Sequence, residues 1–375
     1  MIEGEASFIL KQVIIECISS QVLYARPKEA STDAVIHLLK QFLTSFGTNA
    51  SRATIPLILL DHAKERLAES SYSDVSAAVR CLHQVASMCI ALEEVSSKRL
   101  SNGDNPSHLR ETIRVLDTTK LVSGMPFKTQ KINDLVERLQ KVIVNDSTRM
   151  AKDLAIGEEP ISLLPVPYKQ SVSISRIAAP SITSFQHILK AKVPVILSDA
   201  IGHWPALSAR PWTNLNYLIT TIGPDRIVPV EIGSSYADET WTQKLVTVRD
   251  FFNHLTDSTK TETWYLAQHN LFSQFPVLGQ DLIVPDYCYA SISDTDDAAG
   301  DAAGDVKMNA WFGPSSTYSP LHTDPYENLL AQVVGFKRVM LVSPSDSSCV
   351  YPYDPDSMLN NTAQVCLIYP CSFHI

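Results

Sequence analysis

The first 144 residues carry a helical pattern of apolar and polar positions. Apolar side chains recur at three- and four-residue spacing in the stretches 8–18, 35–43, 57–67, 75–92, 107–116 and 132–144. This spacing is that of one face of an α-helix, so each stretch predicts an amphipathic helix. Burying such a stripe is the ordinary use of a surface helix, and we expect an all-α N-terminal domain without chemistry of its own. Helix pairs also form protein-docking surfaces, although no clean internal repeat indicates a solenoid.

The pattern changes after a proline-rich stretch. Residues 157–167 read GEEPISLLPVP, and the three prolines favour extended backbone. Beyond them, short runs rich in Val, Ile, Thr and aromatic residues alternate with Gly and Pro: VPVILSD, RIVPVEIG, TWYLAQ, NAWFG, NLLAQVVG and KRVMLVSP. Many short strands at this spacing predict a sandwich or barrel. We therefore expect an α+β chain with a helical domain at 1–156, a linker at 157–172 and a β-rich domain at 173–375.

Composition narrows the functional classes. A formal net charge of −9, spread along 375 residues, argues against a nucleic-acid-binding surface. The N-terminus lacks a basic signal region, and no apolar run reaches the ~18 residues needed to cross a bilayer, so we expect a soluble intracellular protein. The seven cysteines lack C-x-x-C spacing, which predicts reduced, mostly buried thiols. The acidic segment Asp294–Asp305 fits a solvated loop, because it lacks the ligand order of an EF-hand.

The pair His322 and Asp324 is the first candidate for chemistry. One residue separates them, so on an extended segment both side chains point to the same side. An imidazole and a carboxylate, together with a second His, form the facial triad of non-haem Fe(II) oxygenases. The alternative is a solvated surface pair, because so short a motif also occurs by chance.

Two further polar residues make this hypothesis more specific. Lys337 follows a glycine-containing turn after the expected strand Leu329–Val334. A lysine that projects into a barrel is costly unless it meets an anion, and a dicarboxylic 2-oxo acid supplies one. Asn328 lies two strand periods beyond Asp324 and can donate to the same molecule or to a metal-bound water. The alternative for Lys337 is an exposed hairpin charge.

The stretch HTDPYENLLAQVVGFKRVMLVSP resembles the core of the JmjC-domain oxygenases, in particular those of the lysine-demethylase and arginyl-hydroxylase type. The segments VPVILSDAIGHWPAL, RIVPVEIGSSYADETWTQKLVTVRDF, TWYLAQHNLFSQFPVL, IVPDYC and VYPYDPDSMLNNTAQV resemble the family in the same order, from Ser173 to Val365. Fainter similarity, in LLDHAKERLAES and RETIRVLDTTKLVSG, extends to the helical block. The resemblance implies a double-stranded β-helix, the jelly-roll or cupin-like JmjC barrel, after the helical domain.

The resemblance also implies roles for individual residues. The residues that would bind Fe(II) are His322 and Asp324. The residues that would hold 2-oxoglutarate are Lys337, which pairs with its distal carboxylate, and Tyr265, Ser319 and Asn328. The residues that would grip a substrate arginine, by carboxylate pairing and aromatic stacking, are Glu231, Trp241, Gln268 and Trp311. Alternatively, the two tryptophans fill core and Glu231 forms an ordinary ion pair.

The implied reaction is oxidative. 2-Oxoglutarate is decarboxylated to succinate while dioxygen hydroxylates a carbon of an arginyl side chain in a protein or peptide. Histone methyl-lysine demethylation and histone-tail cleavage remain alternatives, as does a non-catalytic role through the helical domain. We expect histones or other chromatin proteins as partners, no direct nucleic-acid or membrane binding, and a nuclear location with the cytoplasm as a second one.

The sequence departs from the family pattern near its end. The family supplies a second histidine from a late W-H-x-V-like segment, which this sequence lacks. After Asp324 the remaining histidine is His374, in a tail whose resemblance ends at Val365, and a terminal residue rarely makes a well-placed ligand. We expect an incomplete barrel with open strand edges and a weakened metal site.

Overall fold

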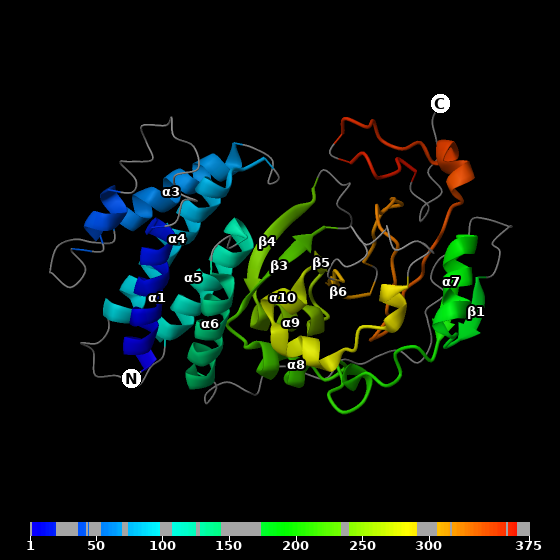
Figure 1. Cartoon of the computed structure of the whole chain (residues 1–375), viewed down its shortest axis with the longest axis horizontal. Helices are drawn as coiled ribbons and strands as arrows, with labels where there is room; N and C mark the ends of the chain where they lie inside the picture. Colours follow the sequence, from blue (N-terminus) through cyan, green and yellow to red (C-terminus); the bar gives the residue numbers. More distant parts are fainter. Residues whose placement is uncertain are drawn as a thin grey trace. The chain divides into compact units, whose positions relative to one another are not determined.

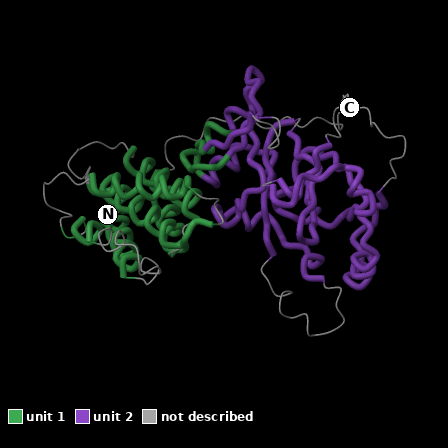
Figure 2. The backbone as a smooth tube through the Cα atoms, turned by 90° about the horizontal axis from the view of Figure 1, so that it is seen from above, with its two compact units in different colours: residues 1–150, 223–229, 245–251 green, residues 151–222, 230–244, 252–375 purple. Residues whose placement is uncertain are grey.

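The structure is a computed structural model that describes residues 2–19, 37–42, 44, 54–69, 74–97, 107–124, 128–143, 174–233, 240–290, 306–315, 317–357 and 359–365. It divides into two compact units (Figure 2). The first comprises residues 1–150, 223–229 and 245–251, and the second comprises 151–222, 230–244 and 252–375. The expected linker at 157–172 and the acidic loop at 294–305 lie outside the described residues.

Helices make up most of the first unit (Figure 1). They are α1 (Ile2–Ser19), α3 (Thr54–Ala68), α4 (Ala77–Ser97), α5 (Ser107–Ser123) and α6 (Thr129–Ile143), and residues 37–42 are also helical. The helical pattern of the sequence is therefore confirmed. Helix α4 contacts α1, α3 and α5, which explains why its residues are buried almost all round.

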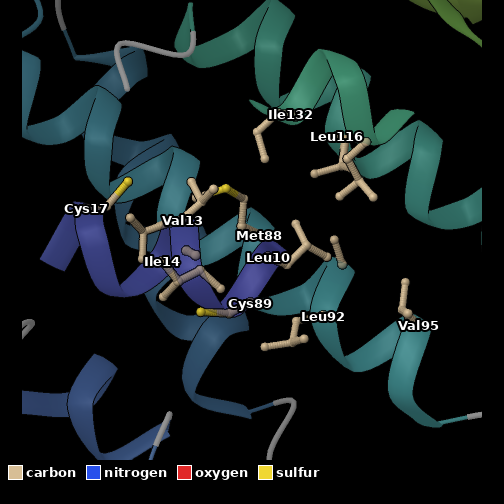
Figure 3. Close-up of a cluster of buried hydrophobic side chains, with 14 of the residues drawn as sticks. Leu10, Val13, Ile14, Cys17, Met88, Cys89, Leu92, Val95, Leu116 and Ile132 are labelled. Carbon is tan, nitrogen blue, oxygen red and sulfur yellow. The ribbon is translucent and has the colours of Figure 1, made fainter. Parts of the chain in front are cut away.

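The core of this unit is aliphatic and closely packed (Figure 3). Leu10 and Ile14 of α1 meet Met88 and Leu92 of α4, and all four side chains are fully buried. Fully burying one such side chain contributes about 1.5–3 kcal/mol. The apolar stripes of the sequence thus account for the stability of the unit.

The cysteines only partly follow the expectation of buried thiols. Cys17, Cys81 and Cys89 are buried free thiols in the helical core, but Cys288 is half-buried and Cys349 is exposed. Burial raises the pKa of the Cys89 thiol, which keeps it protonated and unreactive. The two remaining cysteines of the sequence lie outside the part of the chain that is described.

Ion pairs attach the segment before strand β3 (Ile227–Ile232) to helix α5 within the first unit. Arg226 donates to both carboxylate oxygens of Asp117, at 2.6 Å from Nε and 2.9 Å from Nη2. The neighbouring Asp225 accepts from Arg114 at 3.0 Å and from Arg110. Because buried charges are costly unless paired, these contacts fix the segment against the helix.

The second unit begins with a parallel strand pair. Strand β1 (Ser175–Ala178) pairs with β2 (Val195–Ser198), and helix α7 (Ile182–Ala191) connects them. The helix begins after Ser181, whose hydroxyl accepts the backbone N–H of Ser184 at 3.2 Å, as a good N-cap does. Strand β2 confirms the first of the predicted strands.

A four-stranded sheet, in the order β4-β3-β5-β6, carries four of the ten expected site residues, namely Glu231, Tyr265, Gln268 and Trp311. Its strands are β3 (Ile227–Ile232), β4 (Thr242–Thr247), β5 (Trp264–His269) and β6 (Ala310–Phe312), and β5 is antiparallel to both β3 and β6. Helices α8 (Leu215–Ile222), α9 (Val248–Thr256) and α10 (Leu271–Gln274) lie between the strands in sequence. The α+β class and three further predicted strands are confirmed. No described helix is long and apolar enough to span a membrane.

The two last predicted strands are wrong. Residues 329–342 form no assigned strand, and their apolar side chains are largely exposed, for example Leu330 at 57% and Leu341 at 59%. A strand pattern indicates extended backbone, but a strand also needs a neighbouring ladder, and none pairs with this segment among the described residues. Gly335, with φ of +74°, lies in a bend before Lys337, where the sequence predicted a turn.

Candidate active site

His322 and Asp324 lie together, as their spacing predicts. His322 Nε2 is 3.9 Å from Asp324 Oδ1, and both side chains are part-exposed. The Nδ1–H of His322 donates to the carbonyl oxygen of Pro320 at 2.7 Å, which leaves the lone pair of Nε2 on the side of the carboxylate. Histidines that bind metals are held in this way by a backbone or carboxylate acceptor on the other ring nitrogen.

Asn328 supports the carboxylate of this pair. Its Nδ2 donates to Asp324 Oδ2 at 2.8 Å, so the Oδ1 atom remains toward His322. The sequence predicted Asn328 as a donor to the cosubstrate or to a metal-bound water. In the structure the amide also orients the carboxylate of Asp324, and a ligating carboxylate commonly has such a partner, while the role toward the cosubstrate stays a prediction.

The donor set fits part of a ferrous site. One imidazole and one carboxylate are two of the three protein ligands that non-haem iron oxygenases use. The described residues contain no group of three or more His, Cys, Asp or Glu side chains placed to hold one metal ion. The weak third candidate, His374, lies outside the described residues.

Tyr265 lies buried on β5 beside Ser319, another of the expected cosubstrate residues. Its hydroxyl shares hydrogen bonds with Ser319 and Thr317, while desolvation, reinforced by the nearby Glu231 carboxylate, raises the pKa of the phenol to about 12. The phenol therefore stays protonated near neutral pH and can donate a hydrogen bond. Gly313 makes room for the ring, because a Cβ added there would lie 2.6 Å from a ring carbon of Tyr265.

Glu231, on strand β3 next to β5, forms a contact with Trp241. The indole Nε1–H of Trp241 donates to Glu231 Oε2 at 3.3 Å, and Glu231 lies directly opposite Tyr265 in the β3–β5 pairing. Burial raises the pKa of Glu231, with the Trp241 hydrogen bond acting in the opposite direction. A partly desolvated carboxylate gains most by meeting a cation. The structure thus brings two of the predicted arginine-gripping residues together.

Lys337 and Trp311 form a second contact in the same unit. The ammonium Nζ lies 5.6 Å from the centre of the Trp311 ring, within cation–π range. Desolvation lowers the pKa of Lys337, although the residue as a whole is exposed. Trp311, predicted at the substrate arginine, therefore also borders the lysine predicted for 2-oxoglutarate.

Gln268 lies at an irregularity of strand β5. Its backbone is left-handed, with φ of +46°, and its side chain is exposed, whereas Leu266 two residues earlier is buried. The role of Gln268 in gripping the substrate stays a prediction. Its strand neighbour across the irregularity is Trp311.

Sequence reasoning missed several supporting residues. Thr317, Pro320 and Gly313 support Tyr265 and His322, and Gln274 holds the residue after Gln268. A glycine directly after a strand, as in the sequence WFG, indicates close approach of another group, so the role of Gly313 was predictable from the sequence. The other three depend on contacts that only the folded chain brings about.

Comparisons with known proteins identify the family of the chain. The family described as Cupin-like domain matches residues 181–371. Lysine-specific demethylase 8 of Danio rerio is 36% identical over 82% of this chain and 73% of that protein. Jumonji C domain-containing protein 5 of Drosophila melanogaster is 33% identical over 86% and 77%, respectively. The chain belongs to the JmjC family of oxygenases.

More distant JmjC relatives cover less of the chain. The human protein named Bifunctional peptidase and (3S)-lysyl hydroxylase JMJD7 is 27% identical over 43% of this chain and 50% of its own length. The cupin-like fold expected after the helical domain is confirmed by the family match. As a JmjC protein the chain is an enzyme of the 2-oxoglutarate-dependent dioxygenase class, and the JmjC family generally uses Fe(II) and 2-oxoglutarate.

Proposed function

We propose that this JmjC oxygenase hydroxylates an arginyl side chain of a protein or peptide, using Fe(II) and 2-oxoglutarate. The observation that carries the reaction class is the His322–Asp324 pair, with the Pro320 carbonyl on the far side of the imidazole. The observation that carries the substrate class is Glu231, a half-buried carboxylate with an indole against it. Both lie in the cupin-like unit.

In this proposal His322 and Asp324 hold the metal, and Asn328 fixes the carboxylate. When bound, ferrous ion supplies the dioxygen chemistry that couples decarboxylation of 2-oxoglutarate to hydroxylation. Lys337 binds the distal carboxylate of 2-oxoglutarate, because its ammonium, which lies beside the Trp311 ring, gains from an anion. Tyr265 and Ser319 add hydrogen-bond donors to the same carboxylate.

The chain's own residues also orient the substrate. A guanidinium is planar and presents donors in a fork, so it pairs with the Glu231 carboxylate and stacks on the Trp241 and Trp311 faces. Gln268 offers an amide oxygen as a further acceptor. A histone or another chromatin protein, encountered in the nucleus and with the cytoplasm as a second location, is the substrate we propose.

A second candidate is demethylation of N-methyl-lysine, because the Danio rerio relative is named as a lysine-specific demethylase. A methylammonium also pairs with a carboxylate and an aromatic face, so Glu231 and Trp241 do not separate the two candidates by charge alone. The products separate them. Hydroxylation adds one oxygen atom to the peptide, whereas demethylation releases formaldehyde, and a peptidase cuts the peptide without forming succinate.

The test measures succinate and peptide mass with Fe(II), 2-oxoglutarate and three peptides that differ only in one residue: arginine, lysine or methyl-lysine. We expect succinate and an added oxygen with the arginine peptide. His322→Ala should abolish both signals, while His187→Ala, an exposed histidine of α7, serves as the matched control and should keep them. Succinate without any peptide modification, or modification of the methyl-lysine peptide alone, would contradict arginyl hydroxylation.

A further inference from the structure

The pairing of β5 with β6 contains a bulge at Gln268. Leu266 pairs with Phe312 and His269 pairs with Ala310. Two residues of β5, Ala267 and Gln268, therefore oppose the single residue Trp311 of β6. An extra residue on one strand bends it locally and redirects the side chains at that point, and such bulges are frequent beside active sites.

The bulge changes which way Gln268 faces. In a regular strand, residues two apart share a face, so Gln268 would lie on the side of the buried Leu266. Instead Gln268 is exposed and adopts a left-handed backbone with φ of +46°. For a residue other than Gly, Asn or Asp, this conformation is strained and persists only when its surroundings hold it.

A hydrogen bond made by the residue directly after the bulge holds Gln268 in this conformation. The Nε2–H of His269 donates to Oε1 of Gln274 at 2.6 Å, and Gln274 is 2% exposed at the end of α10. Helix α10 is itself fixed at its start, because the side chain of Asn270 accepts the backbone N–H of Ser273 at 3.2 Å. A buried amide without its imidazole partner would lose a hydrogen bond that water does not replace. The chain is thus anchored one residue beyond Gln268.

We infer that His269 and Gln274 are positioning residues that keep the Gln268 bulge in place, so that the Gln268 amide and the Trp311 ring act together on the substrate side chain. The inference rests on the proposed function for its substrate, an arginyl group. Gln268 supplies a hydrogen-bond acceptor and Trp311 a stacking face, which suit a planar guanidinium with several N–H donors. This His269–Gln274 clamp then sets substrate affinity through Gln268. Trp311, which also borders Lys337, keeps its place on β6 through the ladder pairs on either side of it, so the 2-oxoglutarate end stays unchanged.

The test compares Gln274→Met with Gln274→Glu in the full chain. Methionine keeps similar volume without the acceptor oxygen, while glutamate keeps that oxygen and should restore the contact with His269. Gln84→Met is the matched control, because Gln84 is also fully buried but lies in the helical unit. It tests whether loss of any buried glutamine has the same effect.

Two readouts distinguish positioning from general stability. Amide hydrogen exchange at residues 266–270 should speed up in Gln274→Met and return toward wild type in Gln274→Glu. The KM for the arginine peptide should rise by about 10-fold in Gln274→Met, the loss expected for one hydrogen bond to a charged group. The KM for 2-oxoglutarate should stay constant, and Gln84→Met should change neither readout.

The outcomes separate this inference from the proposed function. Unchanged exchange at the bulge in Gln274→Met would overturn the clamp, whatever the activity. Faster exchange with an unchanged peptide KM would overturn the assignment to substrate affinity. If the wild type neither binds nor modifies the arginine peptide, the proposed function fails and the substrate assignment fails with it, while the exchange result still decides whether the clamp exists.

Discussion

Replacement of Asp117 by alanine should destabilise the helical unit strongly. The Asp117 side chain is 2% exposed and accepts three hydrogen bonds, two from Arg226 and one from the backbone N–H of Ile227 at 3.1 Å. The variant would leave the Arg226 guanidinium, 8% exposed, buried without its carboxylate. Breaking a buried pair by removing one partner costs about 3–5 kcal/mol. The penalty arises from the uncompensated charge more than from the lost attraction.

Urea unfolding monitored by far-UV circular dichroism measures the change, together with hydrogen exchange in α5. Glu69→Ala is the matched control, because the Arg66–Glu69 pair is exposed at 44% and 58% and such pairs contribute only about 0–1 kcal/mol. The double variant Asp117→Leu/Arg226→Met should recover most of the loss, since apolar replacement of a whole buried pair is often neutral. A cost for Asp117→Ala no larger than that of Glu69→Ala would refute the reasoning.

Three other changes test the electrostatics and packing. Desolvation lowers the pKa of Lys120 to about 8, with Arg226 adding to this effect and Asp117 opposing it. Between about pH 8 and the ordinary lysine pKa of about 10.4, the unfolded chain therefore binds more protons than the folded chain. Stability should therefore rise with pH across that window, and Lys120→Met should flatten the rise in thermal unfolding; equal slopes would contradict this. Gly313→Ala should cost about 1–3 kcal/mol by overpacking against the Tyr265 ring, and an unchanged melting temperature would argue against the close fit. Lys337→Met should raise the KM for 2-oxoglutarate about 10-fold or more, with Lys337→Arg milder, and an equal KM in all three proteins would remove Lys337 from the cosubstrate site.

The periodicity of apolar residues was sufficient to predict the helices and strands that local sequence determines. The stripes at 8–18 and 132–144 became α1 and α6, and the run TWYLAQ became β5, because burial of one face or one strand pattern decides these elements. The same reasoning failed at 329–342, where the pattern is strand-like but the described residues offer no ladder partner. Strand pairing is a property of two segments, and a single segment does not report it.

The candidate site likewise contains features that a single segment predicts and features that it does not. The spacing of His322 and Asp324 predicted their proximity, since both lie within one extended stretch. The left-handed backbone of Gln268 could not be predicted from the sequence, because its residue type does not favour that conformation. The Arg226–Asp117 pair joins residues 109 apart in sequence, and the pattern of either segment alone does not identify its partner.

The candidate site joins two regions of different local stability. Glu231, Tyr265 and Trp311 lie on hydrogen-bonded strands, so the substrate end is held by the sheet. His322 is held by an isolated bridge to Thr362, and the segment that follows it to residue 342 is largely exposed. Regions with few buried apolar contacts open at low cost. We therefore expect ligands that bind this end to stabilise it against local opening, which lowers their apparent affinity relative to a preformed site.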